Sequence, residues 1–535
     1  MPALSPLTLI RNPQRDVERV MTAVEAETAL RLRFDDVIAA TRAAADDTET
    51  SFKAFETVLR ECVFALARAA AVFFLVLCEA RVAAAHGAVV ERAGRRFRAA
   101  AAQPRSLTTM FGVVRYWRTY MREVGAETRC GFHPLDVVLG LSADRFSANV
   151  LSHAVRLATK LPYEEARSIM AWLVGAVPST EVIEQAVLGL GRRTADWFLT
   201  ASAPVGDGDV LVIQFDGKGA PQATEEELAR RRVKRGKRVI GGSPSPRHRG
   251  RDHRKRHPKK PRRKKGDHSK NAKIATGVVM YTLRREGGRL LGPLNKWVYA
   301  SFGPKEHVFE VARREATKRG FGPGSGKLGK LTQILTDGDT DLALYIKRYF
   351  PEAIHTIDVM HVIEKLWSAA GALFREGSAE LTRWAELQRE RLYDARIHLI
   401  IDDLRQALKV TPKTGPGNRG KRNRLAEVKR YLENRLEHMN YKELRAQDLE
   451  IGTGQIEGAM KNVIGKRCDQ GGMRWIKERA EALLQLRCIE INGDWDRFII
   501  KVHDENRERA CSEGLRVRIQ EKTAAPLPSL LGYAA

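Results

Sequence analysis

The stretch "KLTQILTDGD", Lys330 to Asp339, is an apolar run that ends at Asp337 and is followed at once by a glycine. A short apolar segment bounded by turn residues predicts a buried β-strand. A second segment, "DVLVIQFDGKG" from Asp209 to Gly219, predicts another strand, which ends at Asp216 before an Asp-Gly pair. Because α/β sheets present ligands and catalytic groups where strands end, Asp216 and Asp337 are candidate site residues.

The elements around these two strands alternate in type. Further strands are expected from "NAKIATGVVMYTLRR", "NKWVYASFG" and "AIHTIDVMH", the last ending at Asp358. Helices are expected from "EHVFEVARREATKRG" and "TDLALYIKRYF". Three strands followed by alternating helix and strand predict an α/β core with a mixed sheet, in the element order of an RNase H-like fold.

A helical pattern follows this core. It runs to about Leu449, which predicts a helical insertion domain at 366–449. The first part of the core would then occupy 206–365, and its final helices, which contain Glu457, would occupy 450–500. Residues 501–535 are expected to form a C-terminal tail.

The chain before the core predicts two further regions. Residues 1–104 are rich in Ala and Arg with helical periodicity, so a helical region for oligomerisation or DNA binding is expected. Residues 105–205 begin with "SLTTMFGVVRYWRTYMR", which predicts a β-hairpin, and continue with three helical patterns. Pro178 and a cap at Ser179 or Thr180 favour a DNA-binding helix-turn-helix there. Three packed helices without a DNA role are the alternative.

Positive charge is concentrated in one stretch. Residues 230–273 hold 21 Lys or Arg against two Asp, a net charge of +19, which leaves only +8 of the total +27 for the rest. Such a run lacks apolar residues to bury and repels itself, so a disordered insertion is expected. Its natural partner is a nucleic acid, and a solvated linker is the alternative. The residues expected to contact DNA here are Arg254, Lys255, Arg256, Lys259, Lys260, Arg262, Arg263, Lys264 and Lys265.

Length and composition describe a globular protein of several domains. The chain has 535 residues with 43% hydrophobic and 29% charged side chains. Its most apolar stretch, Ala69 to Cys78, is shorter than the roughly 20 residues of a membrane span, so a packed helix is expected. The six cysteines form no C-x-x-C pair, which argues against disulfides and a standard zinc site. The first residues show no secretory pattern, so a cytoplasmic, nucleoid-associated protein without a membrane partner is expected.

Three carboxylates on separate elements indicate a metal site. If the helix that carries Glu457 packs across the sheet, Glu457 converges with Asp216 and Asp337. Carboxylates this close raise one another's pKa unless cations neutralise them, and hard divalent ions such as Mg²⁺ prefer oxygen ligands. Two such ions support in-line attack at phosphorus. Asp339 or Asp341 would instead cap the following helix.

Several segments follow one another in order over about residues 105 to 500. They are "FGVVRYWRTYM", "HPLDVVLGL", "VIQFDGKG", "ILTDGD", "FPEAIHTIDVMHVIEKLW", "GTGQIEGAMKNVIGKR" and "GMRWIKERAEALLQLR". Together they resemble bacterial insertion-sequence transposases of the ISKra type, which are DDE enzymes distantly similar to Mutator-like transposases.

The resemblance implies that Asp216, Asp337 and Glu457 form a DDE triad that binds two Mg²⁺ ions, with Mn²⁺ as a substitute. It also implies that the protein binds element ends and target DNA, and a homo-oligomer is expected. Asp358 and His361 match the D-x-x-H motif of Mutator-like enzymes. Asp358 is the main rival of Asp337 as metal ligand, but a hydrogen-bonded pair with His361 is favoured.

A further aromatic residue lies among cations. Trp475 is flanked by Arg467, Arg474 and Lys477. Trp475, Arg467 and Arg474 are predicted to contact DNA, with Trp475 stacking on an unpaired base at an element end. Core packing of Trp475 is the alternative.

The sequence leaves three functions to compare. The first is a DDE transposase that cleaves strands at the element ends and joins them to target DNA. The second is a domesticated, non-catalytic DNA-binding protein, which the presence of all three acids disfavours. The third is an RNase H-like nuclease without strand transfer.

The basic stretch leads to a testable expectation about non-specific DNA affinity. Deleting residues 247–265 removes 12 Lys or Arg. The slope of log affinity against log salt on random duplex DNA should become shallower, by roughly 0.9 for each phosphate that is no longer neutralised. Fluorescence anisotropy at several salt concentrations measures this slope, and a Gly/Ser segment of equal length serves as control. An unchanged slope would identify the stretch as a spacer.

Overall fold

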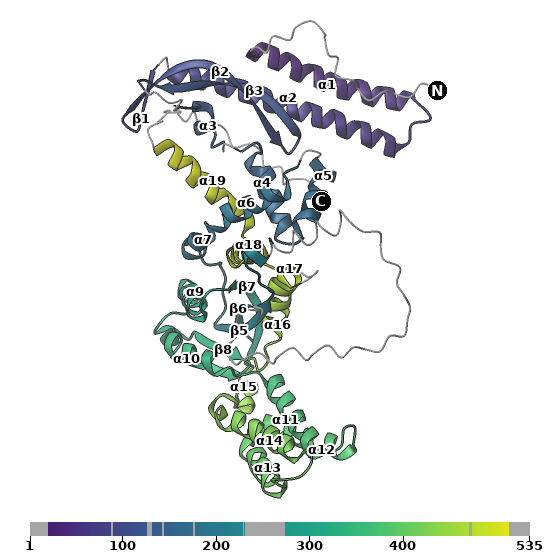
Figure 1. Cartoon of the computed structure of the whole chain (residues 1–535), viewed down its shortest axis with the longest axis vertical. Helices are drawn as coiled ribbons and strands as arrows, with labels where there is room; N and C mark the ends of the chain where they lie inside the picture. The colour runs from purple at the N-terminus through teal and green to yellow at the C-terminus, as the bar shows by residue number, and fades with distance from the viewer. Residues whose placement is uncertain are drawn as a thin grey trace. The chain divides into compact units, whose positions relative to one another are not determined.

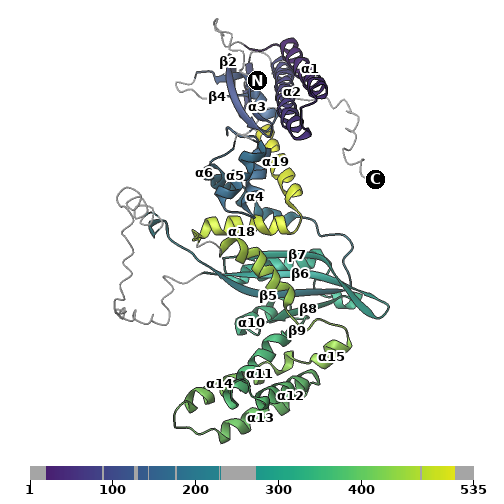
Figure 2. The same ribbon diagram turned by 90° about the vertical axis from the view of Figure 1, so that its right-hand side faces the viewer.

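The structure is a computed structural model in which the chain divides into two compact units (Figures 1 and 2). One unit contains Met1–Ala158, Tyr163–Ala186 and Arg497–Ala535, and the other contains Thr159–Pro162 and Val187–Asp496. The residues that the structure describes are 20–86, 89–125, 131–141, 144–174, 177–227, 229, 273–469 and 473–512. The predicted basic insertion therefore lies outside the described residues, apart from its last residue, Lys273.

The first unit begins with two long helices, α1 (Ala23–Asp46) and α2 (Phe52–His86). Helix α1 starts at a capping box in which the backbone N–H of Glu25 donates to the Thr22 hydroxyl and the Thr22 N–H donates to the Glu25 carboxylate. The most apolar 18-residue window within Phe52–Ala85 of α2 has a mean hydropathy of 2.1, and 11% of that window is buried. Length and composition alone would allow this one helix to cross a membrane.

The helix expected at Ala69–Cys78 is part of α2, and it is packed on one face only. Leu75 and Cys78 are buried in a core cluster. Phe74 and Leu77 are 56% and 45% exposed. The expectation of a packed helix is therefore met on the side of α2 that faces this cluster.

A four-stranded antiparallel sheet follows α2, in the order β1-β2-β3-β4. Its strands are β1 (Val89–Arg92), β2 (Arg95–Thr109), β3 (Gly112–Glu123) and β4 (Gly131–Phe132). The hairpin predicted at 106–122 is confirmed, but the helical region predicted over 1–104 is wrong from Val89 onward. Ala99 and Ala102 of β2 pair with Met121 and Thr119 of β3, and the pairing of β2 with this β-branched and aromatic strand overrides the helix propensity of the alanines.

Short helices complete the chain before the second sheet. They are α3 (Pro134–Val138), α4 (Ala148–Ala158), α5 (Tyr163–Val174), α6 (Thr180–Gly191) and α7 (Thr194–Thr200). The last of the three predicted helices is thus divided into α6 and α7 at Arg192 and Arg193. Helices α5 and α6 follow one another after a short connection, and a DNA-binding role for them stays a prediction.

The second unit contains a five-stranded mixed sheet in the order β7-β6-β5-β8-β9. The strands are β5 (Val210–Ala220), β6 (Lys273–Glu286), β7 (Arg289–Ser301), β8 (Leu331–Thr336) and β9 (Ile354–Ile357). Strands β7, β6 and β5 are antiparallel, whereas β5, β8 and β9 run parallel. The prediction of a mixed α/β core is confirmed.

Helices pack on both faces of this sheet (Figures 1 and 2). Helix α9 (Lys305–Lys318) covers one face, where Phe309 stacks on Phe215 of β5 with ring centroids 4.0 Å apart. Helix α16 (Gly454–Met460) contacts β5 and β6. Because side chains alternate along a strand, Asp216 points to the face opposite Phe215.

A group of helices is inserted between β9 and α16, and its first helix begins at Val359, before the predicted start at residue 366. It comprises α11 (Val359–Leu373), α12 (Ala379–Tyr393), α13 (Ile397–Val410), α14 (Asn418–Glu433) and α15 (Tyr441–Ala446). Beyond α16, the final helices include α18 (Lys477–Ile491) and α19 (Trp495–Ser512), which are separated by Asn492–Asp494. The tail expected from residue 501 is therefore helical as far as Ser512.

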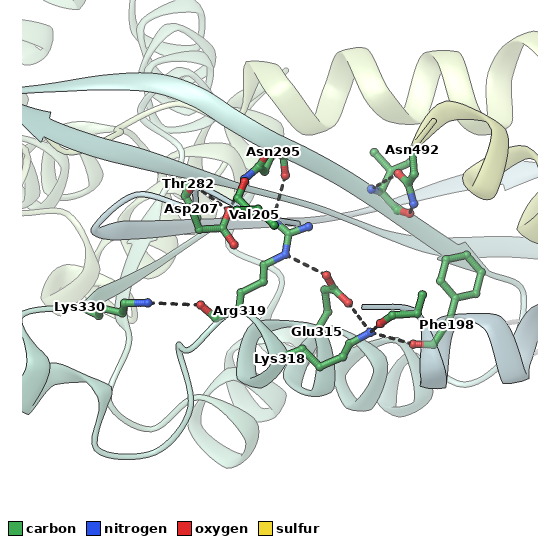
Figure 3. Close-up of polar contacts among 12 residues, drawn as sticks. Phe198, Val205, Asp207, Thr282, Asn295, Glu315, Lys318, Arg319, Lys330 and Asn492 are labelled. Carbon is green, nitrogen blue, oxygen red and sulfur yellow. Dashed lines mark hydrogen bonds and ion pairs between the residues drawn. The ribbon is translucent and has the colours of Figure 1, made fainter. Parts of the chain in front are cut away.

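The C-terminal end of α9 is anchored by buried charges (Figure 3). Arg319 Nε donates to Glu315 Oε1 at 2.9 Å, and Arg319 Nη1 donates to the Asn295 carbonyl at 2.8 Å. Lys318 Nζ lies 2.8 Å from Glu315 Oε2 and donates to the Phe198 and Ala201 carbonyls. Glu315 and Arg319 are each 5% exposed, so each depends on the other to offset its lost hydration.

We expect Arg319→Met to lower the free energy of unfolding by about 3 kcal/mol, because it leaves the Glu315 carboxylate buried with only Lys318 as a partner. The double change Glu315→Gln with Arg319→Met should recover part of this loss. Urea unfolding measures both. A loss below about 1 kcal/mol in the single variant would contradict the buried-charge account.

Candidate active site

The first predicted acid, Asp216, lies inside β5 and not at its end, because β5 continues to Ala220 alongside β6. Pairing of β5 with β8 stops earlier, at Gln214 opposite Leu335. The prediction that a strand ends at Asp216 is therefore wrong for β5 itself. Only the pairing of β5 with β8 ends before Asp216.

The other two aspartates follow their strands directly, as predicted. Asp337 comes one residue after β8, and Asp358 comes one residue after β9. Continuing the parallel registers places Asp216 opposite Asp337 and Asp337 opposite Asp358. Adjacent residues of parallel strands share a face, so the three aspartates form a row across one face of the sheet.

Glu457 reaches this row from α16. The Asp216 pKa is raised because the half-buried side chain loses hydration and because the carboxylates of Asp337 and Glu457 lie near it. Ligand atoms of Asp358, His361 and Glu457 all lie within 4.8 Å of one another. The group of closely spaced ligand atoms thus contains Asp358, His361 and Glu457, and Asp216 and Asp337 are near enough to this group to act on the pKa values of Asp216 and His361.

Asp358 and His361 form the hydrogen-bonded pair that the sequence favoured. Asp358 is 1% exposed, and its carboxylate accepts from His361 Nδ1 at 2.7 Å, Thr453 Oγ1 at 2.5 Å and the Met360 N–H at 3.0 Å. Burial opposes ionisation, but these hydrogen bonds outweigh it and lower the Asp358 pKa. The bond to Asp358 raises the pKa of His361 to about 9, so His361 is a cation at neutral pH.

The remaining acids of "LTDGDTDL" belong to the start of α10 (Thr340–Tyr349). Asp339 is its N-cap and accepts from the Asp341 N–H at 3.0 Å, which confirms the predicted capping role. Lys305 Nζ lies 2.8 Å from Asp339 and 3.5 Å from Asp341. These two carboxylates are therefore engaged by a lysine.

Sequence reasoning missed three side chains of the inserted helices that hold the strand ends. Tyr431 Oη donates to the Asp337 carbonyl at 3.0 Å, and Arg435 Nε donates to the Gly338 carbonyl at 2.7 Å. Tyr441 Oη donates to the Ile357 carbonyl at 2.9 Å, immediately before Asp358. No local pattern marks these residues, because their partners lie more than 80 positions away in the chain.

The predicted DNA contacts near α18 are corrected in part. Arg467 and Trp475 are 1% and 7% exposed, the Arg467 guanidinium lies 4.8 Å from the Trp475 ring centroid, and Trp475 Nε1 donates to the Cys468 carbonyl. Because both side chains are buried, the prediction that Trp475 stacks on a DNA base is wrong, and the alternative of core packing applies. Arg474 is exposed and pairs with Glu227 at 3.2 Å. The nine predicted contacts between Arg254 and Lys265 lie outside the described residues.

The donor set fits a hard divalent cation. Asp216 and Asp337 are half-buried, Glu457 is exposed, and all three offer carboxylate oxygens, the ligands that Mg²⁺ and Mn²⁺ prefer. The raised pKa of Asp216 reflects carboxylates crowded together, which a cation would relieve. His361 fits less well as a ligand because its Nδ1 is bonded to Asp358 and its ring is protonated.

Comparison with known proteins does not show a family for this chain. No protein-family model matches the chain, and no curated protein matches it. Among solved structures, the chain is similar to the Drosophila P element transposase strand transfer complex, with 12% identity and a TM-score of 0.23 over 69% of this chain and 83% of that one. A TM-score of 0.23 does not establish a shared fold.

Because Tyr431 and Arg435 hold the turn at Asp337 and Gly338, adding a methyl group at Gly338 should have a measurable effect on stability. Gly338 has φ +90°, and a Cβ there would lie 2.8 Å from both Arg435 Nε and Tyr431 Oη. Gly324 has φ +78° with nothing within 4 Å of its Cβ position, so it serves as matched control. Both alanine variants should lose about 1–2 kcal/mol of stability for the left-handed backbone.

We expect Gly338→Ala to lose about 1–3 kcal/mol more than Gly324→Ala, because it also displaces the clamping side chains. Urea unfolding of the two variants measures the difference. Equal losses would show that the tyrosine and arginine yield freely and do not hold the turn.

Proposed function

We propose that this protein is a DDE transposase with an RNase H-like core, which binds the ends of an insertion sequence and catalyses strand cleavage and strand transfer. The observation that carries the proposal is that Asp216 of β5, Asp337 after β8 and Asp358 after β9 lie close to Glu457 of α16 and to His361. The order of three antiparallel and then two parallel strands, with helices inserted before the last acid, supports it.

Asp216, Asp337 and Glu457 are proposed as the metal-binding triad. Bound Mg²⁺, or Mn²⁺ in its place, would activate a water or 3′-hydroxyl for attack at phosphorus and stabilise the leaving oxygen. Asp337 is preferred to Asp358 because Asp358 is almost fully buried and its oxygens already accept three hydrogen bonds. Asp358 instead holds His361, whose positive charge faces the acids.

DNA is the proposed partner, and its phosphates would be neutralised by the basic stretch 230–273, with a net charge of +19. Burial of Arg467 and Trp475 removes them from the proposed interface. A homo-oligomer and a location at the bacterial nucleoid belong to the same proposal.

We expect Asp216→Asn and Glu457→Gln each to reduce strand cleavage at least about 100-fold while DNA binding persists, because they remove ligand charge at nearly constant size. The assay is nicking of a plasmid that carries the DNA flanking the gene, in Mg²⁺ and in Mn²⁺. Asp341→Asn, an exposed acid of the neighbouring helix cap, is the matched control and should retain activity.

Three outcomes are informative. Cleavage within about tenfold of wild type would remove that residue from the triad. Cleavage by the wild type without joined product would indicate a nuclease that lacks strand transfer. If the wild type binds the flanking DNA but does not cleave it, the proposal that the protein is an enzyme is wrong.

A further inference from the structure

The buried face of the sheet that leads to the acids carries polar side chains. Val212 pairs with Tyr281 on one side and with Gln333 on the other, and Gln214 follows Val212 by two residues, so all four share a face. Gln214 and Gln333 are 0% exposed and Tyr281 is 1% exposed. Burying an amide without partners costs several kcal/mol, so the hydrogen bonds of these glutamines need an account.

Gln214 uses both ends of its amide on the chain that crosses the sheet. Its Oε1 accepts from the Ile456 N–H at 2.9 Å, and its Nε2 donates to the Gly452 carbonyl at 3.3 Å and to Tyr281 Oη at 3.2 Å. The residue after Ile456 is Glu457. One side chain of β5 therefore bonds the backbone directly before the acid of α16.

Gln333 does the same one strand away. Its Oε1 accepts from the Glu450 N–H at 3.1 Å, and its Nε2 donates to the Glu450 carbonyl at 2.6 Å and to Thr356 Oγ1 at 3.1 Å. Gln333 stands four residues before Asp337, and Gln214 stands two residues before Asp216, on the same faces of their strands. Each glutamine thus shares a rigid strand with one of the acids.

The crossing segment, residues 450–456, is irregular up to the start of α16 at Gly454. Other contacts of this segment are the Val359 N–H, which donates to the Ile451 carbonyl at 2.9 Å, and Thr453, which donates to Asp358. Side chains of the segment are also bonded, since Lys296 Nζ donates to Gln455 Oε1 at 2.8 Å and Tyr281 shares a hydrogen bond with the Glu450 carboxyl. An amide side chain offers a donor and an acceptor together, so it replaces a missing strand neighbour for irregular backbone. No apolar residue of similar size does this.

We propose that Gln214 and Gln333 are positioning residues that hold the crossing segment on the sheet and thereby set Glu457 against Asp216 and Asp337. The inference rests on the proposed function for the role of the acids as metal ligands. The attachment of segment 450–456 to the sheet by the two glutamines is a property of the folded chain alone. Neither glutamine touches the reacting groups.

The test uses Gln214→Met and Gln333→Met in the full-length protein, because methionine keeps the length of the side chain and removes both hydrogen-bonding groups. Hydrogen exchange of peptides covering 450–457 reports whether the segment is released. Binding of Mn²⁺ alone, followed by electron paramagnetic resonance without DNA, reports whether Glu457 keeps its place. We expect exchange at least about tenfold faster there and Mn²⁺ affinity about tenfold weaker.

The matched control is Gln388→Met in α12. Gln388 is also 0% exposed, and its Nε2 donates to Asp403 Oδ2 at 2.9 Å, far in sequence from the crossing segment. This variant should lose stability as well, but without faster exchange at 450–457 and without weaker Mn²⁺ binding. It separates a positioning role from general destabilisation.

The outcomes distinguish this inference from the proposed function. Faster exchange and weaker Mn²⁺ binding in both β-strand variants, but not in the control, support the hold even if the wild type cleaves no DNA. Exchange and Mn²⁺ affinity unchanged in either folded variant overturn it, even if the wild type is an active transposase. A loss of Mn²⁺ affinity in the control equal to that of the two variants also overturns it.

Discussion

The parallel pairing of β5 with β8 is the constraint on which the rest of the site depends. Its register sets Gln214 beside Leu335, and the same register continued by two residues brings Asp216 toward Asp337. A slip of one residue would turn every side chain of β5 to the opposite face, exchanging Asp216 for Phe215. The stacking of Phe215 on Phe309 of α9 opposes that slip, because it requires the aromatic ring on the other side of the sheet.

A polar face inside a sheet is costly, and this one is retained over several strands. Tyr281, Gln214, Gln333 and Thr356 are nearly or fully buried and are hydrogen-bonded to one another or to the segment before Glu457. An apolar helix packed on this face would leave these polar side chains without partners. The crossing segment 450–456 instead offers backbone groups as partners, and Glu457 follows directly after it.

Sequence reasoning found the sheet and the acids because both are local patterns. Apolar runs that end in aspartate located β8 and β9, and alternation of strand and helix predicted the mixed sheet. It failed where distant partners decide the outcome. Asp216 is not terminal because β6 extends β5, and the alanines of β2 are in a strand because β3 pairs with them. Trp475, which looks exposed among cations, is buried against Arg467.

The charges of the site are divided into two groups with opposite behaviour. Asp358 is locked as an anion by its hydrogen bonds, and His361 is locked as a cation by Asp358, so this pair carries little net charge. Asp216, with a raised pKa, instead binds a proton more tightly in the folded chain than when unfolded. Its ionisation therefore opposes folding as pH rises through that raised pKa, and an added cation would remove the penalty. The fold thus neutralises the Asp358–His361 pair internally, whereas Asp216 lies near two further carboxylates, Asp337 and Glu457, whose effect on its pKa the His361 charge opposes.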